Sequence, residues 1–303
     1  MDKTTPYTQS AIVLPRILRD AAARLTNHDA VNAEEFRLRV GQALSVVVNN
    51  KEIALPVTVE REHLELLIET VTRGSYYAVS EQLRCGYVTI EGGHRVGWTG
   101  TAVVKDGNIT ALRDFSGACV RIARQVKGVA GSLMAALCPE QKFVSTLILS
   151  PPGAGKTTLL RDIIRMISGG SAVCAAHRVS LCDERGEVAA LWQGKPCFDV
   201  GARTDVLNGG TKAENLLMLL RSMAPQVIAL DEITAPSDAE ALRQCAHCGV
   251  ELLATAHANN AARFFARPGG KALKELFKRV VLIDRQNGKR RYSVRDEAEA
   301  LIC

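Results

Sequence analysis

The sequence is poor in the features that mark membrane, secreted or base-stacking proteins. No apolar run approaches the ~20 residues of a membrane-spanning helix, and the N-terminal segment MDKTTPYTQS does not have the pattern of a signal peptide. Aromatic residues make up only 5% of the chain, and none interleave with a basic stripe on which bases could stack. The nine cysteines are odd in number and scattered, which is typical of a reducing compartment. We therefore expect a soluble cytoplasmic protein.

The net charge of the chain excludes few classes of binding partner. A formal net charge of +6 permits contact with nucleic acid or an anionic membrane, but argues for neither. The length of 303 residues and the apolar content of 47% predict one large or two ordinary domains. We expect two: an N-terminal α+β domain over residues 1–127 and a C-terminal α/β domain over residues 128–303.

Periodicity predicts the elements of the first domain. An amphipathic pattern with Pro15 in its first turn favours one helix over 12–25. The remaining expected elements are strands around Gly41 within 35–48, helices over 60–71 and 76–84, strands within 86–104 with a turn at Gly92–Gly93, and a hairpin at 106–107.

In the second part of the chain, strands and helices alternate, as in a parallel sheet covered by helices. We expect strands over 144–149, 172–176, 179–182, 226–230 and 251–256, and helices over 129–137, 213–223, 238–247 and 272–278. A final hairpin should pair 280–284 with 291–294 through a turn at 287–288.

A strand, a glycine-rich turn and a helix follow one another at the start of this second part. The segment LILSPPGAGKTTLLRDIIR has the order that a P-loop requires. Backbone N–H groups of 153–157 would surround the β-phosphate of ATP, assisted by the positive helix end. Lys156 would reach the β- and γ-phosphates, and the Thr157 hydroxyl would bind Mg²⁺.

The first glycine of the P-loop pattern is a serine in this chain. Ser150 closes the turn, so a small side chain is acceptable there if its φ is negative. The expected nucleotide-binding residues are Ser150, Pro151, Pro152, Gly153, Ala154, Gly155, Lys156, Thr157 and Thr158.

A second apolar strand ends in two carboxylates, about 75 residues after Lys156. The segment VIALDE places Asp231 and Glu232 where a buried strand emerges, and charges are costly to bury within it. The carboxyl end of a parallel sheet is also where the P-loop opens. We therefore predict that Asp231 holds Mg²⁺ and that Glu232 polarises the attacking water.

Two further strand ends carry polar groups. Thr255 and His257 would lie near the γ-phosphate if their strand neighbours the one bearing Asp231. The cluster of Asp183, Glu184 and Glu187 could position water or contact a neighbouring subunit, with a structural ion-pair network as the alternative; Asp183 and Glu184 are the weaker Mg²⁺ candidates.

Basic residues also gather before and after the P-loop. Arg113, Arg121 and Arg124 precede it, either as a basic linker surface or as phosphate contacts. Lys212 lies in a loop before a predicted helix and Arg221 lies on that helix, and solvated charge is the ordinary interpretation of both.

The order of these motifs resembles the stage III sporulation protein AA family, ATPases similar to the motors of type II secretion and type IV pili. The resemblance covers most of residues 84–235. It rests on the segments RCGYVTIEGGHRVGWTG, LRDFSGACVRIAR, LILSPPGAGKTTLLRDIIR, DERGEVA, DVGARTDVLNG and RSMAPQVIALDEI.

The resemblance implies a RecA-like domain that hydrolyses ATP with Mg²⁺ in a homo-hexameric ring. It also implies that Arg113, Arg121 and Arg124 are catalytic candidates acting on ATP in the adjacent subunit, with Arg221 acting within its own domain. Lys156, Glu232 and His257 complete the catalytic set. The implied partners are membrane-channel proteins of the same sporulation operon. The implied location is the mother-cell cytoplasm, with peripheral contact to the membrane left open and no nucleic acid expected.

Two other functions stay open at this stage. RecA-like domains also drive work on single-stranded nucleic acid. A nucleotide-gated scaffold would bind ATP to assemble the channel without needing turnover.

Overall fold

Two sheets of different character organise the described part of the chain, which comprises residues 5–73, 86–105, 107–258, 260–267, 269–286, 289–296, 298 and 300–303 of the computed structural model. Each sheet belongs to one compact unit. The first unit comprises Met1–Arg124 and Ala190–Cys197, and the second comprises Gln125–Ala189 and Phe198–Cys303.

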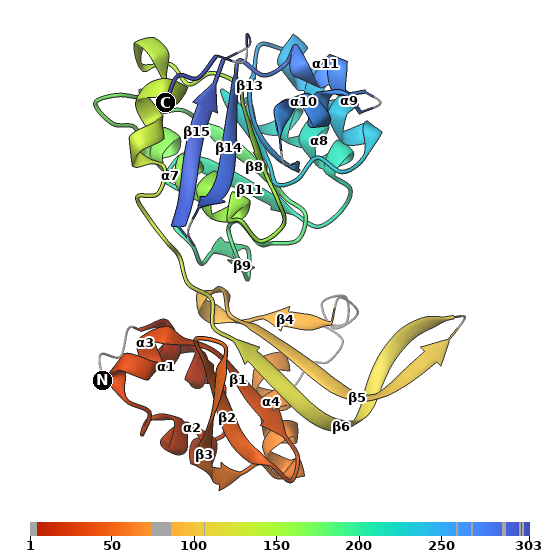
Figure 1. Ribbon diagram of the computed structural model, residues 1–303. Coiled ribbons are helices and arrows are strands. Elements are labelled where there is room, and N and C mark those ends of the chain that lie inside the picture. The colour runs from red at the N-terminus through yellow and green to blue at the C-terminus, as the bar shows by residue number, and fades with distance from the viewer. Residues whose placement is uncertain are drawn as a thin grey trace. The chain divides into compact units, whose positions relative to one another are not determined.

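The first unit is built on a six-stranded antiparallel sheet in the order β3-β2-β1-β6-β5-β4, counted over the described residues (Figure 1). Gly41 adopts a φ of 78° between its first two strands, a conformation that favours glycine. The strands are β1 (Ala33–Arg39), β2 (Ala43–Val48), β3 (Lys51–Thr58), β4 (Tyr87–Thr89), β5 (Arg95–Lys105) and β6 (Asn108–Arg121).

The expected single helix over 12–25 is wrong. The chain instead forms α1 (Pro6–Ala11) and α2 (Arg16–Ala22), followed by α3 (Asn27–Asn32). Pro15 is extended, with ψ at 147°, and stands before the first residue of α2. Its ring disfavours a helical conformation in the preceding residue, so the helix breaks there. Later in the unit, α4 (Arg61–Thr72) matches the helix expected over 60–71.

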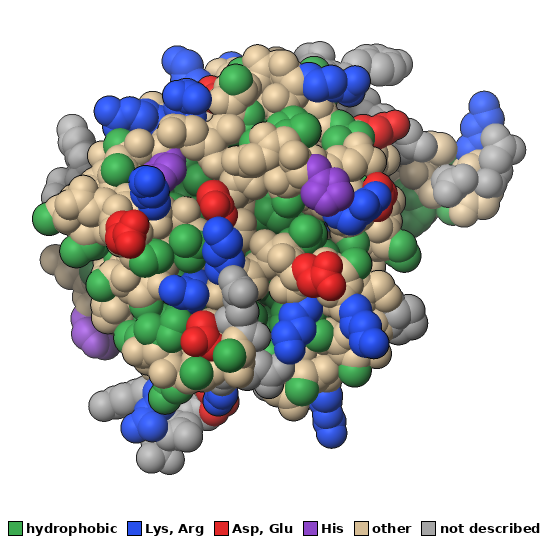
Figure 2. Space-filling view, turned by 90° about the horizontal axis from the view of Figure 1, so that it is seen from above, with side chains coloured by type: hydrophobic (Ala, Val, Ile, Leu, Met, Phe, Trp, Pro, Cys, Tyr) green, Lys and Arg blue, Asp and Glu red, His purple; other side chains and the backbone are tan. Residues whose placement is uncertain are grey.

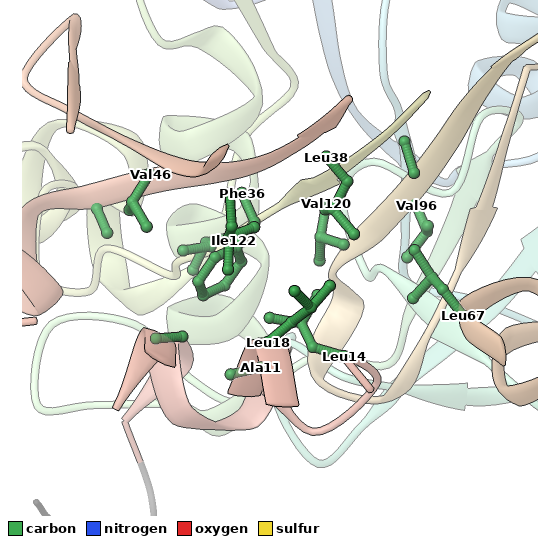
Figure 3. Packing of buried hydrophobic residues seen from close by; sticks show 14 of the residues in the cluster. Ala11, Leu14, Leu18, Phe36, Leu38, Val46, Leu67, Val96, Val120 and Ile122 are labelled. Atoms are coloured by element: carbon green, nitrogen blue, oxygen red, sulfur yellow. The ribbon is translucent and has the colours of Figure 1, made fainter. Parts of the chain in front are cut away.

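Alternation of apolar residues along the strands creates the core of the first unit. Phe36 and Leu38 of β1 and Val120 of β6 point inward, where Leu14 and Leu18 meet them from the helical segment (Figure 3). Phe36 and Val120 have no exposed surface. The core therefore depends on strands that alternate in burial and on helices with one apolar side.

A short excursion from the second part of the chain also belongs to the first unit. Ala190–Cys197, which the division at residue 127 would assign to the ATPase domain, carries the paired strands β9 (Leu191–Trp192) and β10 (Lys195–Pro196). The Arg73 guanidinium lies 5.0 Å from the centre of the Trp192 ring, within the range of a cation–π contact. The chain therefore passes between the two units three times.

The second unit contains a seven-stranded sheet in the order β11-β8-β12-β13-β7-β14-β15, again among the described residues. The first six strands in this order are parallel, and β15 is antiparallel to β14. Their bounds are β7 (Thr146–Ser150), β8 (Val179–Asp183), β11 (Thr204–Asn208), β12 (Val227–Leu230), β13 (Glu251–His257), β14 (Arg279–Gln286) and β15 (Lys289–Arg295).

Helices cover both faces of this sheet. In Figure 1, α7 lies across the sheet from α8 and α9, and the core that includes Leu147 and Leu230 packs against the α8, α9, α10 and α11 side. Continuous apolar runs in β7 and β12 suit strands buried on both faces. The helices are α6 (Met134–Leu137), α7 (Lys156–Gly169), α8 (Lys212–Met223), α9 (Pro236–His247), α10 (Ala261–Phe265) and α11 (Gly270–Lys274).

Three expected elements are absent from the described structure or lie outside it. The strand expected over 172–176 is wrong, because the only pairing there is an isolated bridge between Ser171 and Cys174; the true edge strand is β11. The helix expected over 76–84 and the turn at 287–288 lie outside the described residues. No helix that the structure describes is both long and apolar enough to span a membrane.

Candidate nucleotide-binding site

The P-loop connects the buried strand β7 to the helix α7. Gly153 and Gly155 adopt φ values of 70° and 107°, which only glycine accommodates readily. Ser150, by contrast, is not among the residues with positive φ, and its hydroxyl donates to the carbonyl of Pro151 at 2.8 Å. A serine therefore fits the first position of this loop without backbone strain.

Lys156 is the first residue of α7 and is only 7% exposed. Its Nζ lies 2.8 Å from Nδ1 of His257. Burial lowers the pKa of Lys156, while the nearby charges of Glu232 and Asp231 raise it. The ammonium group is thus held among acidic side chains at the start of a helix.

Asp231, directly after β12, receives two hydroxyl hydrogen bonds. Thr157 Oγ1 donates to its Oδ2 at 3.1 Å and Thr255 Oγ1 donates to its Oδ1 at 3.0 Å. Burial raises the pKa of this carboxyl, and the two threonine hydrogen bonds act in the opposite direction. The Asp231 carboxylate therefore links the start of α7 to the strand β13.

Glu232 has an unusual backbone for a residue with a side chain. Its φ is 67°, and such left-handed positions persist only where the surroundings fix them. The Glu232 N–H donates to Thr255 Oγ1 at 2.9 Å, and its carbonyl accepts from Lys212 Nζ at 2.9 Å. Its carboxylate lies 3.3 Å from Nε2 of His257.

The strand order explains why these residues meet. β13 lies between β7 and β12, and its last residue, His257, is opposite Ser150. Because the three strands are parallel, their carboxyl ends share one edge of the sheet. The structure brings together six residues singled out from the sequence: Lys156, Thr157, Asp231, Glu232, Thr255 and His257.

The acidic cluster after β8 is engaged in other contacts. The Asp183 carboxylate is 1% exposed and accepts N–H bonds from Glu187, Val188 and Ala189, at distances between 2.8 and 3.2 Å. Glu184 lies 3.3 Å from Lys212 Nζ. Burial raises the pKa of Asp183 against those backbone hydrogen bonds. These contacts favour the structural alternative for this pair over Mg²⁺ binding.

The three candidate arginines before the P-loop all belong to the first unit. Arg113 is exposed and lies 3.6 Å from the Asp114 carboxylate, and Arg121 is exposed at the end of β6. Arg124 donates to the carbonyls of Ala33 and Ala30. None of them is part of the cluster formed within the second unit. Arg221 is exposed on α8 and donates to the Leu217 carbonyl at 3.1 Å.

Two cations buried beside the site have no clear signal in the sequence. Lys212 is 7% exposed and donates to Thr234 Oγ1 at 2.9 Å as well as to the Glu232 carbonyl. Arg161, one turn and a half into α7, donates to the carbonyls of Val188 and Glu187 and lies over the Phe198 ring. The amphipathic pattern of α7 shows that Arg161 lies on the helix that follows the P-loop. It does not show that the side chain is buried.

The donor set fits Mg·ATP better than a protein-bound metal. No group of three or more His, Cys, Asp or Glu side chains that could hold a metal ion occurs among the described residues. Thr157 and Asp231 offer oxygens, which Mg²⁺ prefers, and this ion commonly keeps waters and phosphate oxygens as its other ligands. The two glycines of the loop leave room for the backbone to approach a phosphate.

A family model and a curated protein each match most of this chain. A family model described as sporulation stage III, protein AA matches residues 9–297. Stage III sporulation protein AA of Bacillus subtilis (strain 168) is 35% identical over 280 residues, which cover 92% of this chain and 91% of that protein.

Two solved structures share the fold at low sequence identity. The Legionella pneumophila ATPase DotB superposes with a TM-score of 0.58 and 17% identity, over 87% of this chain and 76% of that one. The pilus retraction motor PilT, solved with bound ADP, gives a TM-score of 0.58 and 16% identity, over 92% of this chain and 80% of that one. At these identities the likeness extends to the fold alone.

Proposed function

Because the chain belongs to the sporulation stage III protein AA family, we propose that it is a RecA-like P-loop ATPase that energises a membrane-embedded channel complex during endospore formation. The observation that carries the proposal is the meeting of Lys156, Asp231 and Glu232 at one sheet edge. The titles of the two structural neighbours, an ATPase and a pilus motor with bound ADP, support the same class of activity.

Each residue at this edge has a distinct task in the proposed reaction. The N–H groups of the loop and the N-terminus of α7 bind the phosphates, and Lys156 adds a positive charge near the β- and γ-phosphates. Thr157 and Asp231 would hold Mg²⁺, which neutralises charge on the phosphate oxygens when bound.

Glu232 is the residue we assign to orienting the attacking water. Its backbone is fixed on both sides, by Thr255 and by Lys212, so its carboxylate has little freedom to leave the site. His257 lies between Lys156 and Glu232, 2.8 Å from the first and 3.3 Å from the second. It is therefore suited to keep the lysine and the carboxylate apart until the γ-phosphate comes between them.

We further propose that the active form is a homo-hexameric ring, in which an arginine of one subunit reaches ATP in the next. Arg113 and Arg121 are exposed and available for such a contact, whereas Arg124 is already engaged with two backbone carbonyls. An arginine supplied in this way raises the rate about 10³–10⁵-fold in related phosphoryl-transfer enzymes. An isolated monomer should accordingly be a slow ATPase.

The test is ATP binding and hydrolysis by the purified chain with Mg²⁺, with its mass measured in solution in parallel. Lys156→Ala should abolish binding or turnover, and Glu232→Gln should bind ATP and retain it. Undiminished steady-state hydrolysis by Glu232→Gln would remove the assigned role of Glu232. A concentration-independent monomer, with and without Mg·ATP, would remove the contact in trans.

The same preparation separates the two alternatives. On the face shown in Figure 2, Lys and Arg side chains lie among acidic and apolar ones rather than in one continuous stripe. Stimulation by single-stranded DNA that falls steeply with salt would nevertheless favour a nucleic-acid motor. If the protein is a scaffold, Glu232→Gln should still assemble the channel. If it is a motor, the same variant should no longer energise the channel.

A further inference from the structure

The C-terminal hairpin reaches the edge of the sheet at which the P-loop begins. β14 pairs in parallel with β7 through Leu282 and Leu149, and it continues to Gln286 before the chain returns as β15. At about 3.3 Å per residue, the four residues beyond Leu282 extend the hairpin well past the last pair with β7. Its far end is therefore level with the loop rather than with the strand.

Arg290, the second residue of β15, lies directly against this loop. A Cβ built on Gly155 would be 3.0 Å from Cζ, 3.1 Å from Nε and 3.2 Å from Nη2 of Arg290. Gly155 immediately precedes Lys156 and has a φ of 107°. The guanidinium group thus occupies the space over the one loop residue that both backbone geometry and this contact require to be glycine.

The placement suits a phosphate ligand better than a structural cation. Among the described residues, no carboxylate or carbonyl partner of the Arg290 guanidinium is found, and the residue is exposed. The structural arginines of this unit behave differently: Arg161 donates to two backbone carbonyls, and Arg165 is paired with the buried Asp162 at 2.7 Å.

We propose that Arg290 is a second phosphate-binding cation of the same chain, donating N–H groups to a phosphate of the nucleotide held by the P-loop. The inference rests on the proposed ATP-binding function. A guanidinium offers parallel N–H donors that match two phosphate oxygens. Its position beside Gly155, where the backbone approaches the β-phosphate, makes ADP and ATP common ligands, whereas AMP lacks that group.

The neighbouring arginine provides a matched control. Arg291 is also exposed, but successive residues of a strand point to opposite faces, so it does not share the position of Arg290 over the loop. Replacing either one removes one positive charge from the same hairpin. A difference between the two variants therefore reports position rather than net charge.

The experiment measures the dissociation constants of ADP and of Mg·ATP, by fluorescence of a labelled nucleotide and its competition, for wild type, Arg290→Ala, Arg290→Lys and Arg291→Ala. Because a hydrogen-bonded charge contributes strongly to phosphate binding, Arg290→Ala should bind ADP about 10-fold to 100-fold more weakly. Arg290→Lys should recover part of this loss, and Arg291→Ala should bind as wild type does. Equal weakening in both alanine variants, or none in Arg290→Ala, overturns the assignment.

Two further measurements separate this inference from the proposed function. If Lys156→Ala loses nucleotide and Arg290→Ala does not, only the role of Arg290 fails; if wild type binds no nucleotide, the proposed function itself fails. Mixing Lys156→Ala with Arg290→Ala subunits tests the action within one chain. Recovery of ATP turnover in the mixture would mean that the arginine serves the adjacent subunit, and would overturn the assignment in cis.

Discussion

The two sheets of this protein use their charged residues in different ways. In the antiparallel sheet of the first unit, ion pairs join near neighbours, such as Arg37 with Glu35 at 2.7 Å and Arg39 with Glu52 at 2.6 Å. In the parallel sheet of the second unit, contacts at the strand ends join residues 74 and 101 positions apart, as Thr157 with Asp231 and Lys156 with His257. Parallel connectivity gathers distant residues at one edge, which is why the chemistry concentrates there.

The two units also differ in the role of their buried polar groups. In the first unit, His94 is fully buried and accepts the N–H of Ala123 at 3.0 Å, so its contact fixes the backbone. In the second unit, the buried Lys156 and Lys212 and the half-buried Asp231 gather around a common centre. Substitutions of buried residues in the first unit should therefore change stability, and those at the second sheet edge should change activity first.

Asp231→Asn should produce the largest effect on activity. Loss of the proposed Mg²⁺ ligand should lower ATP turnover by about 100-fold or more, because the metal contributes several kcal/mol to such reactions. Thermal stability should change far less than turnover, since burial of this carboxyl raises its pKa while the two threonine hydrogen bonds act in the opposite direction. Turnover, Mg²⁺ dependence of nucleotide binding and thermal unfolding should be measured together. The exposed Asp205→Asn on β11 is the control, and equal loss in both variants would refute a specific role for Asp231.

Phe36→Ala should show the opposite behaviour. Phe36 is fully buried in the core of the first unit, and truncating such a residue costs about 3–5 kcal/mol. Denaturant unfolding and hydrogen exchange should show destabilisation confined to the first unit, while the ADP affinity of the folded protein stays unchanged. Phe36→Leu, which leaves a smaller cavity, should lie between the variant and wild type. A loss of ADP affinity without loss of stability would contradict the division between the units.

His94 should make the first unit sensitive to acid. Burial lowers the pKa of His94 to about 4 from 6.5, so between these values the unfolded chain binds the proton that the folded chain excludes. The free energy of unfolding is therefore at its full value above pH 6.5. It falls as the pH drops towards 4, by about 3 kcal/mol in total. Denaturant midpoints measured across this range should show the slope for wild type, and His94→Gln should flatten it. A slope unchanged by His94→Gln would assign the acid sensitivity to other groups.

The sequence predicts best what depends on local pattern. The P-loop, the strand that ends at Asp231 and Glu232, and the helix that begins near Lys212 follow from glycine positions and apolar periods. Because the carboxyl ends of parallel strands share one edge of a sheet, the sequence also predicts that these segments meet. It does not show which strands are neighbours. The break at Pro15 was open to prediction, because proline restricts the residue before it.

What the sequence could not predict depends on long-range pairing. No local pattern indicates the return of Ala190–Cys197 to the first unit, where Trp192 lies against Arg73. Arg290 lies beside Gly155 only because β14 pairs with β7. Lys212 follows a polar loop, where an exposed charge is the ordinary expectation, and only the fold shows that it is buried against Glu232.

Lys212→Ala should have the smallest effect of these substitutions, because Lys212 contacts the site only through Glu232. Lys212 fixes the carbonyl of Glu232 at 2.9 Å and also lies 3.3 Å from Glu184. Since a hydrogen bond to a charged group contributes about 2 kcal/mol, Lys212→Ala should lower turnover by about 10–30-fold. Its ADP affinity should stay near that of wild type, because the phosphate-binding residues are unchanged. The exposed Lys142→Ala is the control.

A positioning role for Lys212 is distinguishable from a purely structural one. If the lysine acts by holding Glu232, kcat should fall while the affinity for Mg·ATP is kept, and combining Lys212→Ala with Glu232→Gln should add little further loss, since interacting residues are not additive. If the lysine acts through its ion pair, Glu184→Gln should reproduce the whole loss. Parallel decreases in kcat, nucleotide affinity and thermal stability would instead show that this buried lysine supports the sheet edge as a whole, and the separation between activity and stability drawn for the second unit would not hold at this position.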